Sequence, residues 1–375
     1  MDETRAKFGL LGPMLVTVAD RPVALGTPKQ RAVFAMLLIN RNRSVGTESL
    51  IDATWDESPV PAARTSIHSY VSHLRRRLGD AGVDPKVLES APPGYRLNVA
   101  DGECDLDRFI AGKAAGMRAA AASRFEEASG HLSAALAEWR GPVLDDLSNF
   151  PFVAEFATAL AEDRMVALVA YAEAEIACGR ANAIIGELEA LAAKNPYHEP
   201  LWAQLITAYY VAERQSDALA AYRRLKAKLA EDLGIDPGPT VSALHGQILR
   251  QERLDPKHSA RTTAARAMAF LRSGSVRSTV VASLRDAAGR HYPLQAAITR
   301  IGRLPENHIV LSDEDVSRNH AVIFDTGSSF VITDSESANG VLVQHRRIRP
   351  SATLADGDHI DICGHVFVFE LLGES

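Results

Sequence analysis

The sequence has few of the residues that carry metal, redox or membrane chemistry. Its three cysteines are too far apart for a disulfide framework or a paired metal-binding motif; they are Cys104, Cys178 and Cys363. No stretch without a charged residue exceeds 13 residues, whereas a membrane-spanning helix needs about 20 apolar residues. These features exclude a membrane-spanning protein. We expect a cytoplasmic protein with reduced thiols that binds no metal and no cofactor.

The sequence also lacks the motifs by which common enzyme classes are identified. It has no GxxxxGK[ST] loop for nucleoside triphosphates, no HExxH zinc motif, no GxSxG nucleophile and no kinase signature. Its acidic pairs, such as Asp145 with Asp146, are typical of solvated loops. We therefore expect that the protein is not an enzyme.

Charge is unevenly distributed along the chain. The net charge is −6, but residues 1–100 balance to +3, residues 101–250 to −8 and residues 251–375 to −1. A mildly basic N-terminal segment favours nucleic-acid binding there, and not along the whole chain. At about 100–200 residues per domain, the length predicts two to four domains.

The first domain, residues 1–102, is predicted to mix strands and helices. Two strands are expected over Phe8–Val18 and Pro22–Gly26, followed by three helices. The third helix runs from about Pro61 to Leu78, and a hairpin over Val87–Val99 follows it. The domain is therefore of the α+β class.

The pattern changes three times after that. Residues 103–252 are rich in alanine with aromatic residues at helical spacing, which predicts an all-α domain. Residues 253–277 are mostly basic, and their composition predicts a mobile linker. Residues 278–375 contain short strands between turn signals, which predicts an all-β sandwich of about ten strands.

A 34-residue repeat runs through the helical domain. One set of positions fits the tetratricopeptide pattern, and the same positions 34 residues earlier are apolar in five of six cases. Such helix pairs bury their faces only by stacking, and they form a small solenoid with a groove for a peptide. A spacer that only buries its own core is the alternative. The later set is Trp202, Leu205, Tyr209, Ala218, Tyr222 and Leu225.

The third predicted helix has a polar face without acidic residues. Its apolar residues share the opposite face, which should pack inward; they are Ile67, Tyr70, Val71, Leu74 and Leu78. A face of hydroxyls, imidazoles and arginines suits the major groove of DNA, and the following hairpin would bring two residues to the backbone or minor groove. A solvated helix with a basic end is the alternative. The candidate DNA contacts are Arg64, Thr65, His68, Ser69, Ser72, His73, Arg76, Tyr95 and Arg96.

Two resemblances follow from these motifs. Thr27–Arg31, Ile67–Leu78 and Pro92–Leu97 resemble the winged helix-turn-helix of response-regulator DNA-binding domains, which implies double-stranded promoter DNA as a partner. The helical domain closes with Asp232–Pro239 and resembles the bacterial transcriptional activation domain of streptomycete antibiotic regulatory proteins. That resemblance allows RNA polymerase as a further partner.

A further group of candidate binding residues lies in the β-rich domain. Gly302-Arg303 ends a strand, Ser317-Arg318-Asn319-His320 follows fourteen residues later, and Asn339-Gly340 comes after two further predicted strands. A phosphate dianion needs cationic and hydroxyl donors of this kind. Order and spacing resemble the forkhead-associated domain, which reads phosphothreonine. The resemblance assigns phosphate contacts to Arg303, Ser317 and Arg318 and a peptide contact to Asn339, with Gly302, His320 and Gly340 supporting the loops.

One departure from that family is visible. Ala338 stands where a hydroxyl residue often touches the phosphopeptide, and Glu336 adds a repelling charge. The loss of one hydrogen bond to a charged group costs about 1.5–3 kcal/mol. We therefore expect weaker phosphopeptide binding than in a fully equipped member.

The three modules together resemble the EmbR-type mycobacterial transcriptional regulators. The matching stretches include Gly26–Ala32, Leu205–Tyr210 and Arg300–Arg303. The resemblance implies that the forkhead-associated domain docks a phosphorylated serine/threonine kinase, which changes binding at promoters of arabinosyltransferase genes. A phosphoprotein adaptor that sequesters the kinase, with DNA binding vestigial, is the alternative from another class. A purely structural scaffold is weaker, because it leaves the phosphate constellation without a purpose.

Overall fold

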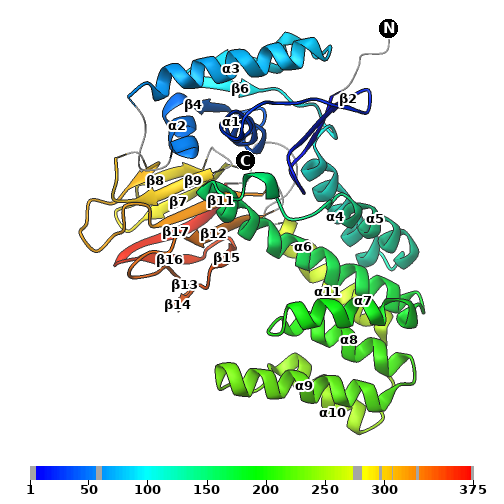
Figure 1. Cartoon of the computed structure of the whole chain (residues 1–375). Helices are drawn as coiled ribbons and strands as arrows, with labels where there is room; N and C mark the ends of the chain where they lie inside the picture. The colour runs from blue at the N-terminus through cyan, green and yellow to red at the C-terminus, as the bar shows by residue number, and fades with distance from the viewer. Residues whose placement is uncertain are drawn as a thin grey trace. The chain divides into compact units, whose positions relative to one another are not determined.

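The computed structural model describes residues 6–55, 61–272, 281–294, 298–305, 307–326 and 329–372. The chain forms two compact units. Unit 1 comprises Met1–Ile110, Ala137–Asp163 and Phe270–Ser375, and unit 2 comprises Ala111–Leu136 and Arg164–Ala269. Figure 1 shows mixed strands and helices at the blue end, helices in green and strands from yellow to red. The predicted order of fold classes is therefore confirmed.

The N-terminal part of unit 1 has two small sheets around three helices. The sheet orders are β1-β2-β3 and β4-β6-β5. Helix α1 begins at Thr27, whose amide donates to Gln30 Oε1 at 2.9 Å in a capping box with Pro28 in the first turn. The elements are β1 Ala6–Gly9, β2 Leu15–Val18, β3 Arg21–Pro22, α1 Pro28–Ile39, β4 Ser44–Gly46, α2 Thr47–Trp55, α3 Ala63–Asp80, β5 Leu88–Ala91 and β6 Gly94–Leu97.

The single strand predicted over Phe8–Val18 is wrong. The segment folds back on itself, so that β1 and β2 form an antiparallel pair with Phe8 opposite Val16. Gly12 has a φ of 154°, and Pro13 has no amide hydrogen to extend a ladder. Leu10 and Leu11, between the two strands, are buried because they belong to a turn that packs inward.

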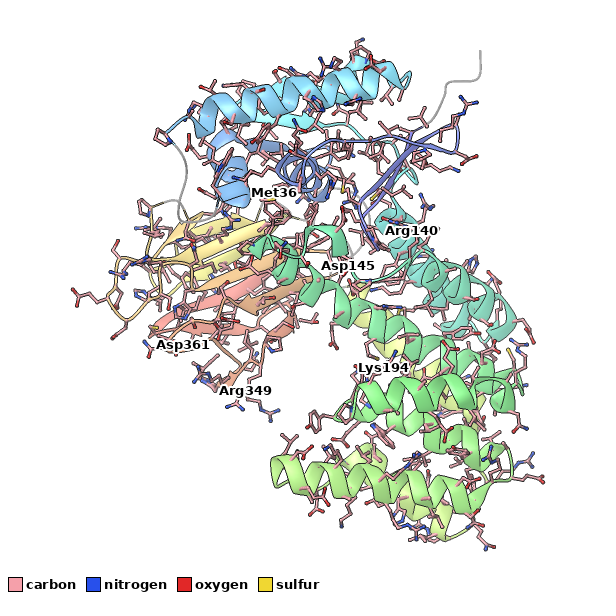
Figure 2. All side chains as sticks on the ribbon, in the orientation of Figure 1. Met36, Arg140, Asp145, Lys194, Arg349 and Asp361 are labelled. Carbon is pink, nitrogen blue, oxygen red and sulfur yellow. The ribbon has the colours of Figure 1, made fainter. Side chains whose placement is uncertain are left out.

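Asp105, the first residue of helix α4, anchors this turn. Its carboxylate accepts the amides of Leu10 at 2.8 Å and Leu11 at 3.0 Å, and Asp105 is only 2% exposed. Arg140, labelled in Figure 2, donates to the same carboxylate at 3.2 Å and to the carbonyl oxygen of Pro13 at 2.9 Å. One buried carboxylate thus satisfies two backbone amides and one guanidinium.

The predicted helix pairs are confirmed. The pair α8 and α9 carries the later repeat positions, and Trp202, Tyr209 and Tyr222 are all buried in one core. The pair formed by the second half of α6 and α7 packs on α8, with Ile184 and Leu188 in the same core. The helices are α4 Asp105–Ala121, α5 Phe125–Ala137, α6 Pro151–Ala177, α7 Ala181–Lys194, α8 Glu199–Val211, α9 Gln215–Leu233, α10 Pro239–Leu249 and α11 Pro256–Arg272.

Helix α11 contradicts the prediction of a mobile linker over residues 253–277. Ala260 is buried beside Phe125 and Ala177, and Ala264 is buried in a cluster that contains Leu132. Two alanines one helical turn apart fit closely against the alanine-rich surface of α4, α5 and α6. The end of the predicted linker, from Ser273 to Arg277, lies outside the described residues.

Glu173 on α6 is a buried carboxyl group within unit 2. It is 8% exposed, the Gln204 amide donates to its Oε1 at 3.2 Å, and it hydrogen-bonds the side chain of Thr263. Burial outweighs both hydrogen bonds and raises the pKa of Glu173 to about 8. At neutral pH the folded protein therefore holds a proton that the unfolded chain releases.

We expect this proton to make stability depend on pH. Between the ordinary pKa of 4.5 and the folded value of about 8, unfolding releases the proton, so rising pH favours unfolding. The effect is at most about 1.4 kcal/mol per pH unit. The substitution Glu173→Gln removes this pH dependence of stability. In urea unfolding, the stability advantage of Glu173→Gln over the wild type should grow between about pH 5.5 and about pH 7.5. A constant difference would contradict the assignment.

The C-terminal part of unit 1 is a sandwich of two sheets. Their orders are β10-β9-β11-β12-β15 and β14-β13-β16-β17-β7-β8. Strands β8, β14 and β15 have little sequence signal, because each is short and carries polar or proline residues that interrupt the alternation. The strands are β7 Val281–Asp286, β8 His291–Leu294, β9 Ile298–Gly302, β10 Ile309–Val310, β11 Ala321–Asp325, β12 Phe330–Asp334, β13 Leu342–Val343, β14 Arg346–Arg347, β15 Ser351–Leu354, β16 His359–Ile362 and β17 His365–Leu372.

Candidate functional site

Helix α3 presents a continuous polar face to solvent. Thr65, Ser69, Ser72 and Arg76 are all exposed, and they recur every three to four residues along the helix. Opposite them, the four predicted core residues Ile67, Val71, Leu74 and Leu78 are buried. Tyr70, the fifth, is partly buried and stacks on Trp55 with ring centroids 6.0 Å apart.

Two histidines and Arg64 flank this face, and each has a partner. His68 Nδ1 lies 2.5 Å from the Tyr95 hydroxyl. His73 lies beside Arg76, with Nδ1 3.2 Å from the Arg76 guanidinium. Arg64 forms an exposed ion pair with Glu48, which solvent screens. The face therefore keeps its positive charge, and the Tyr95 hydroxyl orients the His68 ring.

The prediction that Tyr95 reaches DNA is wrong. Tyr95 is 6% exposed, because β6 alternates and turns Tyr95 and Leu97 toward the core. Arg96 points to the other side of the strand, and its Nε donates to Glu89 Oε1 at 2.7 Å. Hydrogen bonds from Asn98 and from Arg96 hold the pKa of Glu89 below its usual range. The Arg96 charge is thus partly compensated within the hairpin.

Arg75 joins the helix to the hairpin, a role that the sequence did not indicate. Its Nε donates to the Leu88 carbonyl oxygen at 2.8 Å and its Nη2 to Ser90 Oγ at 3.0 Å. The guanidinium also lies 5.6 Å from the centre of the Tyr95 ring. Arg75 is therefore a positioning residue, and Arg76 is the exposed neighbour on the polar face.

The second candidate site lies on loops that follow strands of the sandwich. Gly302 ends β9, and a side chain there would collide with the Arg318 carbonyl oxygen. This close approach allows the amide of Arg303 to donate to the Ser317 carbonyl oxygen at 3.0 Å. The arginines at 303 and 318 are exposed on the two joined loops. Glycine is required here by the distance between the backbones.

His320 ties three segments together from inside the domain. It is fully buried, its Nδ1 accepts the Ser317 amide at 3.0 Å, and its Nε2 lies 3.1 Å from the Gly340 carbonyl oxygen. Because Nδ1 accepts a hydrogen bond, the ring proton is on Nε2, which donates to the Gly340 carbonyl oxygen. The neutral ring therefore fixes the Ser317 loop against the loop that carries Asn339.

The Asn339 loop is also bonded directly to the Ser317 loop. The amide of Ala338 donates to Ser317 Oγ at 3.1 Å, and Asn339 Nδ2 donates to the Asp315 carbonyl oxygen at 2.8 Å. Gly340 has a φ of 80°, which glycine adopts without strain. The structure thus brings all seven residues of the predicted phosphate constellation to one loop cluster.

Three residues of this cluster were not predicted. Ser337 Oγ accepts the Gly340 amide at 2.9 Å, and Asn307 Nδ2 donates to the Arg318 carbonyl oxygen at 2.8 Å. Arg347 on β14 lies against Gly340 and adds a third exposed arginine near the loops. Arg347 had no sequence signal, because its place depends on the pairing of β14 with β13.

Three family models match the chain. They are the C-terminal domain of transcriptional regulatory proteins over residues 20–97, the bacterial transcriptional activator domain over 104–249 and the FHA domain over 299–363. The transcriptional regulatory protein EmbR of Mycobacterium bovis and of Mycobacterium tuberculosis is 63% identical over 373 residues, which cover 98% of this chain and 96% of the relative. The chain belongs to the EmbR family of transcriptional regulators.

Other comparisons agree with the EmbR family. A solved structure of Mycobacterium tuberculosis EmbR, in complex with a low-affinity phosphopeptide, superposes with a TM-score of 0.96 at 62% identity and covers 99% of each chain. The regulatory protein MoaR1 of Mycobacterium tuberculosis is 51% identical over 251 residues, 66% of this chain and 81% of the relative. Like EmbR, the chain is a transcriptional regulator with a winged helix-turn-helix, an activation domain and a forkhead-associated domain.

The described residues lack two further features. No helix among them is long and apolar enough to cross a membrane. Within the same residues, no group of three or more His, Cys, Asp or Glu side chains is arranged to hold a metal ion.

Proposed function

We propose that this regulator couples kinase signalling to transcription in the cytoplasm. Its α3 face binds double-stranded promoter DNA, and its forkhead-associated loops dock phosphothreonine of a serine/threonine protein kinase. The resemblance to EmbR-type regulators supports arabinosyltransferase promoters as the targets and RNA polymerase as a further partner.

The observation that carries the proposal is the hydrogen-bonding state of the loop cluster. Ser317 Oγ accepts the Ala338 amide, so its own proton remains available for a phosphate oxygen. Asn339 donates through Nδ2, which leaves its side-chain carbonyl to accept an amide of a bound peptide. Arg303 and Arg318 supply exposed positive charge for a phosphate that carries about −1.5 to −2 at neutral pH.

Calorimetric titration tests this proposal. The full-length protein is titrated with a phosphothreonine peptide from a kinase activation loop and with the same peptide unphosphorylated. Micromolar binding of the phosphorylated peptide alone is expected. Equal binding of both peptides, or of neither, would refute phosphothreonine docking.

The substitution Arg76→Ala should weaken promoter binding about tenfold and reduce the log–log salt slope by about one, because Arg76 extends an exposed cation from the polar face. A mobility-shift series at several salt concentrations measures both quantities. Arg223→Ala, which removes an exposed arginine from α9, is the matched control and should bind like the wild type. A loss that is equal in both variants would remove α3 from the interface.

The adaptor function remains a second candidate because of Ala338. This residue brings no hydroxyl to the loop, and Glu336 beside it is exposed. An adaptor that sequesters the kinase would bind the phosphopeptide and show no specific promoter binding for Arg76→Ala to reduce. The same two experiments therefore distinguish the regulator from the adaptor.

A further inference from the structure

Unit 2 contains a cavity of about 600 Å³ between α6, α8 and α10 of the activation domain and α11, which follows that domain. Helix α6 contributes Val169 and Ile176, and α8, α10 and α11 complete the wall with alanine, proline, valine and leucine side chains interspersed with threonine, serine and glutamine. Figure 1 labels these four helices in the green and yellow part of the chain. A volume of this size is typical of sites for small organic molecules.

The ionisable side chains that line the cavity are all acidic. Of the described residues that line the cavity, two are ionisable, Glu173 from α6 and Glu199 from α8, and the residues from α10 and α11 are neutral. Glu199 is already engaged, since its carboxylate accepts the amide of Gly238 at 2.7 Å and so holds the start of α10. Glu173 also has hydrogen-bond partners, but they are neutral side chains, and it is the buried carboxyl group of the wall.

A buried carboxyl group without a cation is costly to the fold. Glu173 is 8% exposed, and its polar neighbours are the neutral side chains of Gln204 and Thr263. An apolar residue of similar size would fill this position without the desolvation cost. A carboxyl group that costs stability and lines a cavity is a candidate for ligand recognition.

We infer that this cavity binds a small apolar molecule with one protonated amine, whose ammonium group pairs with Glu173. The apolar wall receives the hydrocarbon part of the ligand, and the ammonium donates hydrogen bonds to the carboxylate. Glu173, which is protonated in the empty cavity at neutral pH, loses its proton to solvent as the ion pair forms. Binding is therefore coupled to the release of about one proton.

The test is isothermal titration calorimetry of the full-length protein with three probes of matched shape: 4-phenylbutylamine, 4-phenylbutanol and 4-phenylbutyrate. The amine should bind at least about tenfold more tightly than the alcohol, and the carboxylate should bind most weakly. Titrations in phosphate and in Tris, which differ in ionisation enthalpy, should give a release of close to one proton with the amine near pH 7.

Two variants decide whether Glu173 is responsible. Glu173→Gln should lower amine affinity about tenfold or more, abolish proton release and leave alcohol binding unchanged. Glu231→Gln, an exposed position on α9, should behave like the wild type. Circular dichroism checks that both variants fold. The inference is overturned if the amine does not bind at millimolar concentration, if amine and alcohol bind equally, or if Glu173→Gln binds the amine like the wild type.

Discussion

Replacement of Arg303 by alanine should lower phosphothreonine-peptide affinity about 100-fold while the fold remains intact. We expect the exposed Arg303 guanidinium to form charge-assisted hydrogen bonds to the phosphate, and the loss of such bonds costs about 1.5–3 kcal/mol. The loop itself depends on the Arg303 amide, which donates to the Ser317 carbonyl oxygen and is retained in alanine. Calorimetric titration with the phosphorylated peptide measures the change.

Controls for this experiment come from the same domain. Arg303→Lys keeps the charge without the planar fork of donors and should give an intermediate affinity. Arg290→Ala removes an exposed arginine from the turn between β7 and β8 and should have no effect. If Arg303→Ala binds within about twofold of the wild type, the phosphate is held elsewhere in the loop cluster.

The substitution Asp105→Ala should destabilise the N-terminal part of unit 1 by about 3–5 kcal/mol. It would leave the buried amides of Leu10 and Leu11 without their acceptor and Arg140 without its counter-charge. Because a multidomain chain does not unfold in one step, a local readout is preferable to a melting temperature. Hydrogen exchange of the peptide that contains Leu10 and Leu11 should accelerate by at least about 100-fold.

The matched substitution is Asp80→Ala at the end of α3, an exposed position whose negative charge opposes the helix dipole. It should leave exchange at Leu10 and Leu11 unchanged. Asp105→Asn keeps one acceptor oxygen and should fall between the wild type and the alanine variant. Wild-type exchange rates in Asp105→Ala would show that other groups satisfy these amides.

The inner face of α3 was predictable because a helix of 18 residues repeats its pattern several times. Tyr95 was not predictable by the same means. Its strand has four residues, and the strand that pairs with it, β4, has three. In β4, Val45 lies opposite Tyr95, and neither short strand carries enough alternation to reveal which face is buried. The sequence therefore indicated the helix, while the sheet beneath it came only from tertiary pairing.

The phosphate constellation was predictable because its residues follow strands whose ends meet at one edge. The contacts that hold this loop cluster together were harder to predict from the sequence. The order of the residues says nothing of Asn307, whose amide bridges to Arg318, or of Arg347, which lies against Gly340. The two contacts span 11 and 7 residues of sequence, and they depend on loop conformations and strand registers that short strands do not specify.

The connection between the activation domain and the forkhead-associated domain includes helix α11. The direction in which the chain leaves this helix therefore depends on the number of residues in the helix. In a flexible connector, the removal of one residue only shortens the reach of the chain. In a helix, it turns the point at which the chain leaves the helix by about 100° and draws that point back by about 1.5 Å. A deletion between Ala264 and Arg272 therefore changes the direction in which the chain leaves the helix. A deletion of seven residues, close to two full turns, restores that direction to within about 20°.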